Sequence, residues 1–443
     1  MNNKPKMSKY FESIQPSPIR MAGLEFNKRT DADEIDILDV SVGNVCLPMH
    51  PAMQKRMFNL GDKKSPFNKG INEYTSTKGT KDANEAFLTI LKHEGFKISG
   101  LHTQITDGGS KAMELVILGL CGEPGKDERP LMLIDATYTN YISIAKRLGR
   151  KTVSITRHLD DDGQFSLPDI KTIEKCIKNH KPSALLVIPY DNPTGQCFSH
   201  EQMVDLAKIC VEHNLWMVSD EAYRELTYNS KEISSIWGIL DNEVPGIEGR
   251  RISIETSSKI WNACGLRIGA LISDNREFSH KGVAENTMNL CANSIGQYIF
   301  GSLAKAKKED LDKWYEQQRK YYYEIAKSLV DGFHKHLPEV IISKPQASIY
   351  SVIDVRNIVD ADFNCIDFVK FCARKGKVDI NGKYRTLFLS PMISFYSCKK
   401  IEKNPGRTQM RIAYIKDLEE MKQIPVLFKK LMDQYLEHKY LES

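Results

Sequence analysis

The sequence lacks any long hydrophobic run. Of its 443 residues, 41% are hydrophobic and 27% are charged, which is typical of a folded globular protein. The longest apolar stretches, such as 131–134 and 184–188, have the length of a strand. A helix that crosses a bilayer needs roughly 20 apolar residues. The sequence therefore predicts no membrane-spanning segment and no membrane partner.

Paired cysteines and an excess of one charge are also lacking. The ten cysteines include no Cys-x-x-Cys pair, which favours reduced thiols in a cytoplasmic protein over a disulfide framework or a metal site. The formal net charge is only +5, and no basic block with interleaved aromatic residues occurs, so nucleic acid is not an expected partner. The first ten residues carry lysines without an apolar segment behind them, which is not the pattern of a secretory signal.

Short apolar runs alternate with helical patterns between about residues 74 and 300. Strands are predicted at 131–135, 152–155, 184–188, 216–219 and 252–254. These runs lack polar alternation, as in parallel strands that are buried on both faces. Ser199 and Gln202 predict a capping box at the start of an apolar-striped helix. Alternating strands and helices predict an open α/β sheet.

The character of the sequence changes after about residue 304. A long charged amphipathic segment, 305–336, leads into strand-like pieces and a final helix predicted at 418–438. We expect a large domain at 61–304 and a smaller α+β domain at 305–443. Residues 1–60 are too few and too polar to form a core alone, so we expect an arm that completes the small domain.

Lys259 lies in a loop that is rich in hydroxyl groups. Thr256 and Ser258 precede it, and Arg267 follows eight residues later. Hydroxyls and an arginine around one point suit a phosphate group. A lysine beside them can attack a carbonyl carbon and form a Schiff base. Taken alone, the pattern favours a surface lysine in a polar loop.

Three further motifs stand at the edge where ligands bind in open α/β sheets. Asn192-Pro-Thr-Gly195 and Asp220-Glu-Ala-Tyr223 each follow a predicted parallel strand. Asp107-Gly-Gly-Ser-Lys-Ala112 precedes an apolar helix predicted at 113–120, and its glycines allow backbone N–H groups to approach a phosphate. Asp220 ends an apolar strand, so its carboxylate needs a cationic partner. The order and spacing of the four motifs are together specific.

With these motifs, the chain resembles the class I/II aminotransferases of the aspartate aminotransferase superfamily from about Gly43 to Arg411. The resemblance implies fold type I: an α/β large domain with a mostly parallel seven-stranded sheet, and a smaller α+β domain. It implies a pyridoxal 5′-phosphate cofactor held as a lysine aldimine. It further implies ping-pong transfer of an amino group between an L-amino acid and a 2-oxo acid, in a homodimer with shared active sites.

The resemblance also assigns site residues. Lys259, Asp220 and Tyr223 match the catalytic residues, with Lys259 moving the proton and Asp220 keeping the pyridine nitrogen protonated. The other cofactor-binding positions are Gly109, Ser110, Lys111, Tyr138, Asn192, Thr256, Ser258, Arg267 and, from a neighbouring subunit, Tyr74. Gly43, Asn192 and Arg411 match positions that bind substrate, with Arg411 on the α-carboxylate. Tyr138 is equally compatible with a core tyrosine at a strand end.

Departures from the family pattern surround the expected substrate side-chain pocket. Ala347-Ser-Ile-Tyr350 replaces a Gly-Gly pair before an aromatic residue, and Ser390-Pro-Met392 replaces the usual Pro-Gly. These departures leave the identity of the substrate undetermined. A lyase or cyclase on the same scaffold, for example a C–S β-eliminating enzyme, is the first alternative. A regulatory protein that binds the cofactor without turnover is the second.

Overall fold

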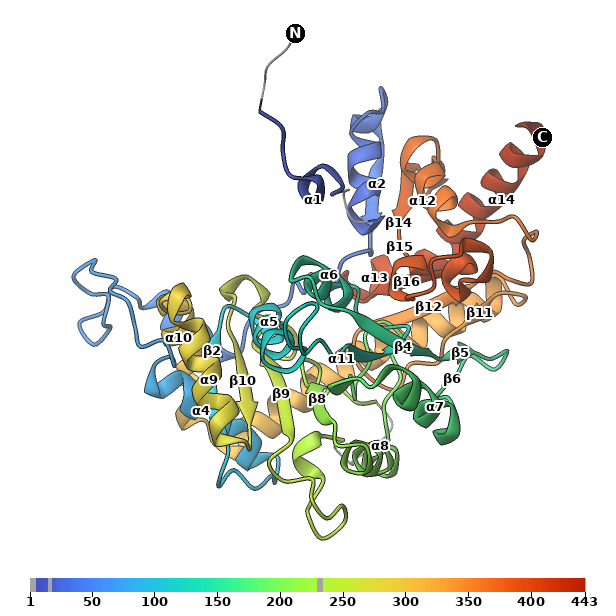
Figure 1. Ribbon diagram of the computed structural model, residues 1–443. Coiled ribbons are helices and arrows are strands. Elements are labelled where there is room, and N and C mark those ends of the chain that lie inside the picture. The colour runs from blue at the N-terminus through green and yellow to red at the C-terminus, as the bar shows by residue number, and fades with distance from the viewer. Residues whose placement is uncertain (1–4, 15–17, 229–233, 443) are drawn as a thin grey trace.

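The central feature of the computed structural model, which describes residues 5–14, 18–228 and 234–442, is a seven-stranded sheet (Figure 1). In spatial order its strands are β2 (His102–Thr106), β10 (Gly269–Ser273), β9 (Arg251–Thr256), β8 (Trp216–Asp220), β7 (Ala184–Val187), β3 (Leu131–Asp135) and β4 (Thr152–Thr156). β10 runs antiparallel to β9 and β2, and the remaining neighbours are parallel. The expected mostly parallel sheet is therefore confirmed.

Both faces of this sheet are buried, as the apolar runs predict. On β3, Leu131 and Leu133 join the core of one face, while Met132 and Ile134 join the core of the other. Alternation of side chains along a strand explains this division. The first face is covered by α5 (Gly109–Leu120), α6 (Asn140–Arg147) and α9 (Arg276–Glu285), and the second by α4 (Lys81–His93), α7 (Ile170–His180) and α8 (His200–Glu212).

A second, smaller unit packs beside the large sheet. It contains an antiparallel sheet of β11 (Ile341–Ile342), β12 (Tyr350–Asp354), β16 (Gln409–Ala413) and β15 (Ser390–Pro391), in that order. A three-stranded sheet joins β1 (Asp36–Asp39), β14 (Lys383–Phe388) and β13 (Val378–Ile380), with β1 parallel to β14. The helices of this unit are α12 (Cys365–Arg374), α13 (Leu418–Met421) and α14 (Ile424–Glu442), and α11 (Lys308–His336) leads into it.

The N-terminal segment packs on this smaller unit. Ala22 and Phe26, on α2 (Pro18–Phe26), are buried, and α2 lies against α12 (Figure 1). Together with the pairing of β1 and β14, this contact supplies the N-terminal part that the small domain was expected to need. The domain limits at residues 60 and 304 stay a prediction. The remaining elements are α1 (Lys9–Glu12), α3 (Pro51–Phe58), α10 (Ser294–Phe300), β5 (His158–Leu159) and β6 (Phe165–Ser166).

The local predictions are largely confirmed, with three corrections. The five predicted strands are present, and Ser199 and Gln202 form the capping box of α8. The final helix is wrong as one piece, since α13 and α14 are separate; Pro425, which lacks an N–H group, stands in the first turn of α14. The helix predicted at 113–120 begins earlier, at Gly109.

The third correction concerns the large sheet, in which the sequence predicted neither β2 nor β10. Four of the five residues of β2 are polar, and β10 follows the Lys259 loop. No helix within residues 5–14, 18–228 and 234–442 is both long and apolar enough to cross a membrane. The ten cysteines all lie in these ranges and form no disulfide.

Candidate active site

A cavity of about 300 Å³ lies where the parallel strands end. The carboxyl ends of β3, β7, β8 and β9 meet at one edge because these strands run in the same direction, so the loops that follow them converge. Most of the predicted site residues line this cavity: Gly43, Gly109, Ser110, Tyr138, Asn192, Asp220, Tyr223, Thr256, Ser258, Lys259, Arg267 and Arg411. Residues from distant parts of the chain are thus brought to one place.

Asp220, the last residue of β8, holds a carboxylate against the cavity. The hydroxyl of Tyr141 donates a hydrogen bond to Oδ2, and the backbone N–H of Ala222 donates to Oδ1 at 3.0 Å. Loss of hydration raises the pKa of Asp220 to about 6. The cationic partner that the sequence led us to expect is not supplied by any residue that the structure describes. The open side of this carboxylate therefore suits a cationic ligand atom.

The amine of Lys259 reaches the middle of the same cavity wall. Its Nζ donates a hydrogen bond to the carbonyl oxygen of Gly43 at 2.5 Å. A Cβ atom at position 43 would collide with the hydroxyl of Tyr350, so only glycine allows the backbone to come this close to Tyr350. The contact joins the N-terminal segment of the small unit to the loop after β9.

Backbone N–H groups, hydroxyls and a guanidinium converge at the start of α5. Gly108 is the N-cap of α5 with φ of 76°, and a Cβ there would collide with the guanidinium of Arg267. The Thr256 hydroxyl donates to the Ser258 hydroxyl at 2.7 Å. A helix N-terminus with a nearby arginine attracts anions. The arrangement therefore has the donors that a phosphate group requires.

Arg411, on β16 of the small unit, is buried, and its side chain lines the cavity. Its Nη1 donates to Asn192 Oδ1 at 2.7 Å, and its Nη2 donates to the carbonyl oxygen of Ser41 at 2.8 Å. The guanidinium also lies 4.3 Å from the ring centre of Tyr350. Within the described ranges no carboxylate pairs with Arg411, and its Nε is buried without a hydrogen-bond partner. An anionic ligand would supply the missing charge.

Tyrosines form much of the remaining wall. The Tyr223 and Tyr350 hydroxyls lie 2.7 Å apart, and burial raises the pKa of Tyr223 well above its usual range. Asn140 donates to the Tyr138 hydroxyl at 2.8 Å, and burial raises the pKa of Tyr138 to about 12. Tyr141 meets the ring of Tyr138 edge to face, with centroids 5.4 Å apart. Burial thus keeps the phenols of Tyr138 and Tyr223 protonated, so each can donate a hydrogen bond.

Two predicted site residues lie outside this cavity. Lys111 points instead to Glu114, with Nζ 2.8 Å from Oε1, because the two residues are one helical turn apart on α5. Tyr74 is 78% exposed and does not line the cavity. In the single chain, neither side chain contributes to the site.

Sequence reasoning missed several residues of the cavity wall. Tyr141 and Arg20 carried no motif signal, since each lies on a helix of unremarkable pattern. Tyr350 was noticed only as a departure from the family pattern. The signal that could have found Tyr141 is its place on the helix after β3, because helices after parallel strands begin at the ligand edge.

Comparison with known proteins decides the family. A model of the family "Aminotransferase class I and II" matches residues 36–373. The chain belongs to this family. The aspartate aminotransferase of Sulfolobus acidocaldarius is 25% identical over 358 residues, which are 79% of this chain and 82% of that protein. The probable kynurenine–oxoglutarate transaminase of Saccharomyces cerevisiae is 24% identical over 263 residues, 55% of this chain and 57% of the relative.

Solved structures of this family share the fold. A mutant of Thermus thermophilus aspartate aminotransferase gives a TM-score of 0.78 at 17% identity, covering 97% of this chain and 100% of that one. A putative kynurenine aminotransferase from Saccharomyces cerevisiae gives 0.78 at 18% identity, covering 97% and 99%. The fold type I architecture and the expected membership of an aminotransferase family are therefore confirmed.

Proposed function

We propose that this class I/II aminotransferase uses pyridoxal 5′-phosphate, bound to Lys259 as a Schiff base, to move an amino group between an L-amino acid and a 2-oxo acid in two ping-pong half-reactions. One observation carries the proposal. Asp220 and Arg411 line the same cavity as the Lys259 amine, and neither has an ionic partner among the described residues. A cationic ring nitrogen and an anionic carboxylate would satisfy both.

The residues present fit the cofactor group by group. Asp220 would face the ring nitrogen, and a positive charge there would favour its ionised form. Asn192 and Tyr223 would hold the 3-oxygen, and Tyr138 would stack on the ring. The phosphate would bind at the N-terminus of α5, with the backbone of Gly109, the hydroxyls of Ser110, Thr256 and Ser258, and Arg267.

The chemistry divides between the cofactor and the protein. The bound cofactor supplies an electron-withdrawing ring that weakens a bond at the substrate α-carbon. Arg411 binds the α-carboxylate and so fixes the orientation of that carbon. With cofactor and substrate bound, the free amine of Lys259 would accept the proton from the substrate α-carbon and would later donate it. Asp220 contributes a fixed negative charge throughout.

A homodimer with shared active sites is part of the proposal. Ser110 and Arg267 are exposed, so the phosphate site opens to the outside of the single chain. Tyr74 is exposed in a segment that also exposes Phe58 by 72% and Ile71 by 55%. Such apolar exposure is typical of a protein interface. A second copy that covers these residues would bring its Tyr74 hydroxyl toward the open phosphate site.

The test is the fate of the amino group. The purified protein, loaded with pyridoxal 5′-phosphate, is given single amino acids with 2-oxoglutarate or pyruvate, and the new amino acid, the new 2-oxo acid and any ammonia are quantified. We expect one new amino acid for each new 2-oxo acid, and no turnover without an acceptor. Release of ammonia and pyruvate without an acceptor would identify a lyase and contradict the proposal.

Two lysine variants sharpen this test. Lys259→Ala should abolish exchange, since no other described lysine lines the cavity. Lys111→Ala removes a lysine near the phosphate site that is paired with Glu114, so exchange should continue. Exchange by Lys259→Ala at the rate of the unaltered protein would show that Lys259 has no role in the reaction.

A further inference from the structure

A second cavity, of about 880 Å³, adjoins the first. It lies between the segment after β1, the helix α11 and the residues after β16. Both cavities are lined by Arg20, Val42, Gly43, Lys259 and Cys264. These five residues, which we call the neck, therefore stand where one cavity opens into the other. The catalytic amine lies in the neck itself.

Arg20 carries the charge of this neck on a helix that is anchored elsewhere. Ala22 and Phe26 face the small unit and are buried, at 1% and 5% exposure. Residues two positions apart on an α-helix are separated by about 200° around the helix axis, so Arg20 stands on the opposite face from Ala22. The structure gives the Arg20 guanidinium no hydrogen bond or ion pair with any residue it describes, and the side chain is exposed. The packing of α2 thus holds at the neck a guanidinium that has no ion-pair partner among the described residues.

The side chain of a bound substrate would point to this arginine. Under the proposed function, the α-carboxylate binds Arg411, which lines the first cavity alone, and the α-nitrogen meets Lys259. The side chain must leave the α-carbon in another direction, and the neck is the opening that remains toward the second cavity. A guanidinium there can bind a carboxylate through two parallel hydrogen bonds.

Charges deeper in the second cavity limit where such an anion can stop. Outside the neck its lining includes three acids, Asp39, Asp417 and Glu420, and one lysine, Lys416. The Asp39 carboxylate accepts hydrogen bonds from Ser41, and Asp417 accepts from the backbone of Glu420 at the start of α13. An anionic group that entered further would meet these acids. The arrangement favours an anion that stays at the neck, beside Arg20.

We propose that Arg20 is a specificity-determining residue that binds a carboxylate on the substrate side chain, so that the preferred amino donors are acidic amino acids. The inference rests on the proposed function, since it takes the positions of the α-carboxylate and the α-nitrogen from it. It assigns a role to a residue of the N-terminal helix and a substrate class to the site.

The kinetic test compares each acidic amino acid with its uncharged amide. In the unaltered enzyme, kcat/KM for glutamate and aspartate should exceed that for glutamine and asparagine by at least about tenfold. Arg20→Gln should lower kcat/KM for the two acids by roughly 10- to 100-fold and leave the amides within about twofold. Arg20→Lys should keep part of the preference. Equal losses for acids and amides would overturn the proposal.

Lys416 provides the positional alternative. It lines the second cavity but not the neck. If Lys416→Gln abolishes the preference for acids while Arg20→Gln keeps it, the carboxylate binds beyond the neck and the assignment of Arg20 is wrong.

A binding measurement separates this inference from the proposed reaction. Calorimetry compares glutarate with pentanoate, a monocarboxylate of the same length, on the cofactor-loaded enzyme. We expect glutarate to bind at least about tenfold more tightly, and Arg20→Gln to remove the difference. An unchanged difference in Arg20→Gln would overturn the role of Arg20 even where turnover is normal. Absence of turnover with every amino acid would instead contradict the proposed function.

Discussion

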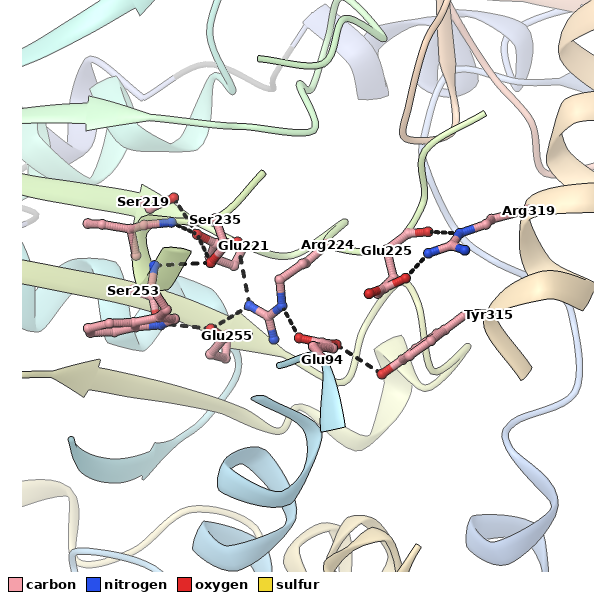
Figure 2. A network of polar contacts seen from close by, with 12 residues as sticks. Glu94, Ser219, Glu221, Arg224, Glu225, Ser235, Ser253, Glu255, Tyr315 and Arg319 are labelled. Atoms are coloured by element: carbon pink, nitrogen blue, oxygen red, sulfur yellow. Dashed lines mark hydrogen bonds and ion pairs between the residues drawn. The ribbon is translucent and has the colours of Figure 1, made fainter. Parts of the chain in front are cut away.

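Asp220 and Glu221 are neighbours in the chain, but their carboxylates lie in two different buried environments. Asp220 faces the cavity, where two hydrogen-bond donors and no described cation meet it. Glu221 instead faces Arg224, whose guanidinium also contacts Glu94 and Glu255 (Figure 2). One carboxylate is left for a ligand, and the other is used by the protein itself.

The cluster around Arg224 is rich in internal partners. The guanidinium lies 2.6 Å from Glu94 Oε2, 2.8 Å from Glu255 Oε1 and 3.5 Å from Glu221 Oε2. The acids receive further hydrogen bonds from the hydroxyls of Ser219, Ser235, Ser253 and Tyr315 (Figure 2). Every charged group of the cluster therefore has an internal partner.

The contrast teaches how to distinguish a site from a structural network. Both regions hold charges away from water. In the cluster, the partners come from β8, β9, α4 and α11, so the charges join these elements. In the cavity, Asp220 and Arg411 have neutral partners only, among the residues described. Uncompensated enclosed charge indicates a ligand, since burial without compensation is costly.

Of the changes that compare the two regions, Asp220→Asn should have the largest effect on catalysis. Asparagine keeps one acceptor oxygen, places an NH2 group where the second carboxylate oxygen stood and loses the negative charge, so kcat should fall on the order of 10²- to 10³-fold. Unfolding free energy should not fall, because a poorly hydrated charge is removed. Glu221→Gln is the matched control, and its kcat should stay within about threefold. A similar fall in both variants, measured by steady-state kinetics, would remove the distinction between the two carboxylates.

Arg224 should support folding stability, whereas Arg411 should support substrate binding. Arg224→Met leaves several carboxylates without their cation and should lower the unfolding free energy by about 3–5 kcal/mol. Arg411→Met should leave stability nearly unchanged but raise KM for amino acids by roughly 10- to 100-fold, since the α-carboxylate loses its partner. Urea denaturation and kinetics check both. A destabilised Arg411→Met with normal KM would reverse the assignment.

The cluster should also make stability depend on pH. Burial raises the pKa of Glu94 and of Glu221 above the usual 4.5. Between that value and the raised values, the folded state holds more protons than the unfolded state, so stability falls as pH rises. From pH 5 to pH 8 we expect a loss of about 1–3 kcal/mol from these groups. Denaturation of Glu221→Gln over the same range should give a shallower loss, and an identical slope would exclude Glu221 as a contributor.

The smallest expected effect is that of Tyr141→Phe. The variant removes the hydrogen bond to Asp220 and keeps the ring that packs against Tyr138. One hydrogen bond to a charged group contributes about 1.5–3 kcal/mol, and the bound cofactor offsets part of this loss. We expect kcat to fall about 5- to 20-fold without loss of folding. An unchanged kcat would place Tyr141 outside the set of residues that tune Asp220.

Much of this fold was readable from the sequence because its signals are local. The apolar runs of β3 and β7 and the capping box of Ser199 each depend on a few adjacent residues. β2 was missed because four of its five residues are polar and it acquires its burial from neighbours that are distant in sequence, whereas β10 is a short, mostly apolar run that was overlooked. The break before α14 follows from Pro425, whose effect on the helix was overlooked.

The site residues also differ in whether a local sequence signal predicts them. Lys259, Asp220 and Asn192 follow strands directly, so their motifs predict a shared location. Arg20 reaches the cavity only through the packing of α2, which no spacing in the sequence reveals, whereas Tyr141 could have been found from its place on the helix after β3. Lys111 shows the converse, since its place in a motif did not decide its direction: Glu114, one turn later, binds it.

The most direct test of the account is to find the atom that binds the cofactor. The protein is incubated with pyridoxal 5′-phosphate, reduced with borohydride, digested and analysed by mass spectrometry. The account predicts one modified residue, Lys259, and no modification at that peptide in Lys259→Ala, whereas Lys111→Ala should be modified like the unaltered protein. Specific, stoichiometric modification of a different lysine, or none at all, would contradict it.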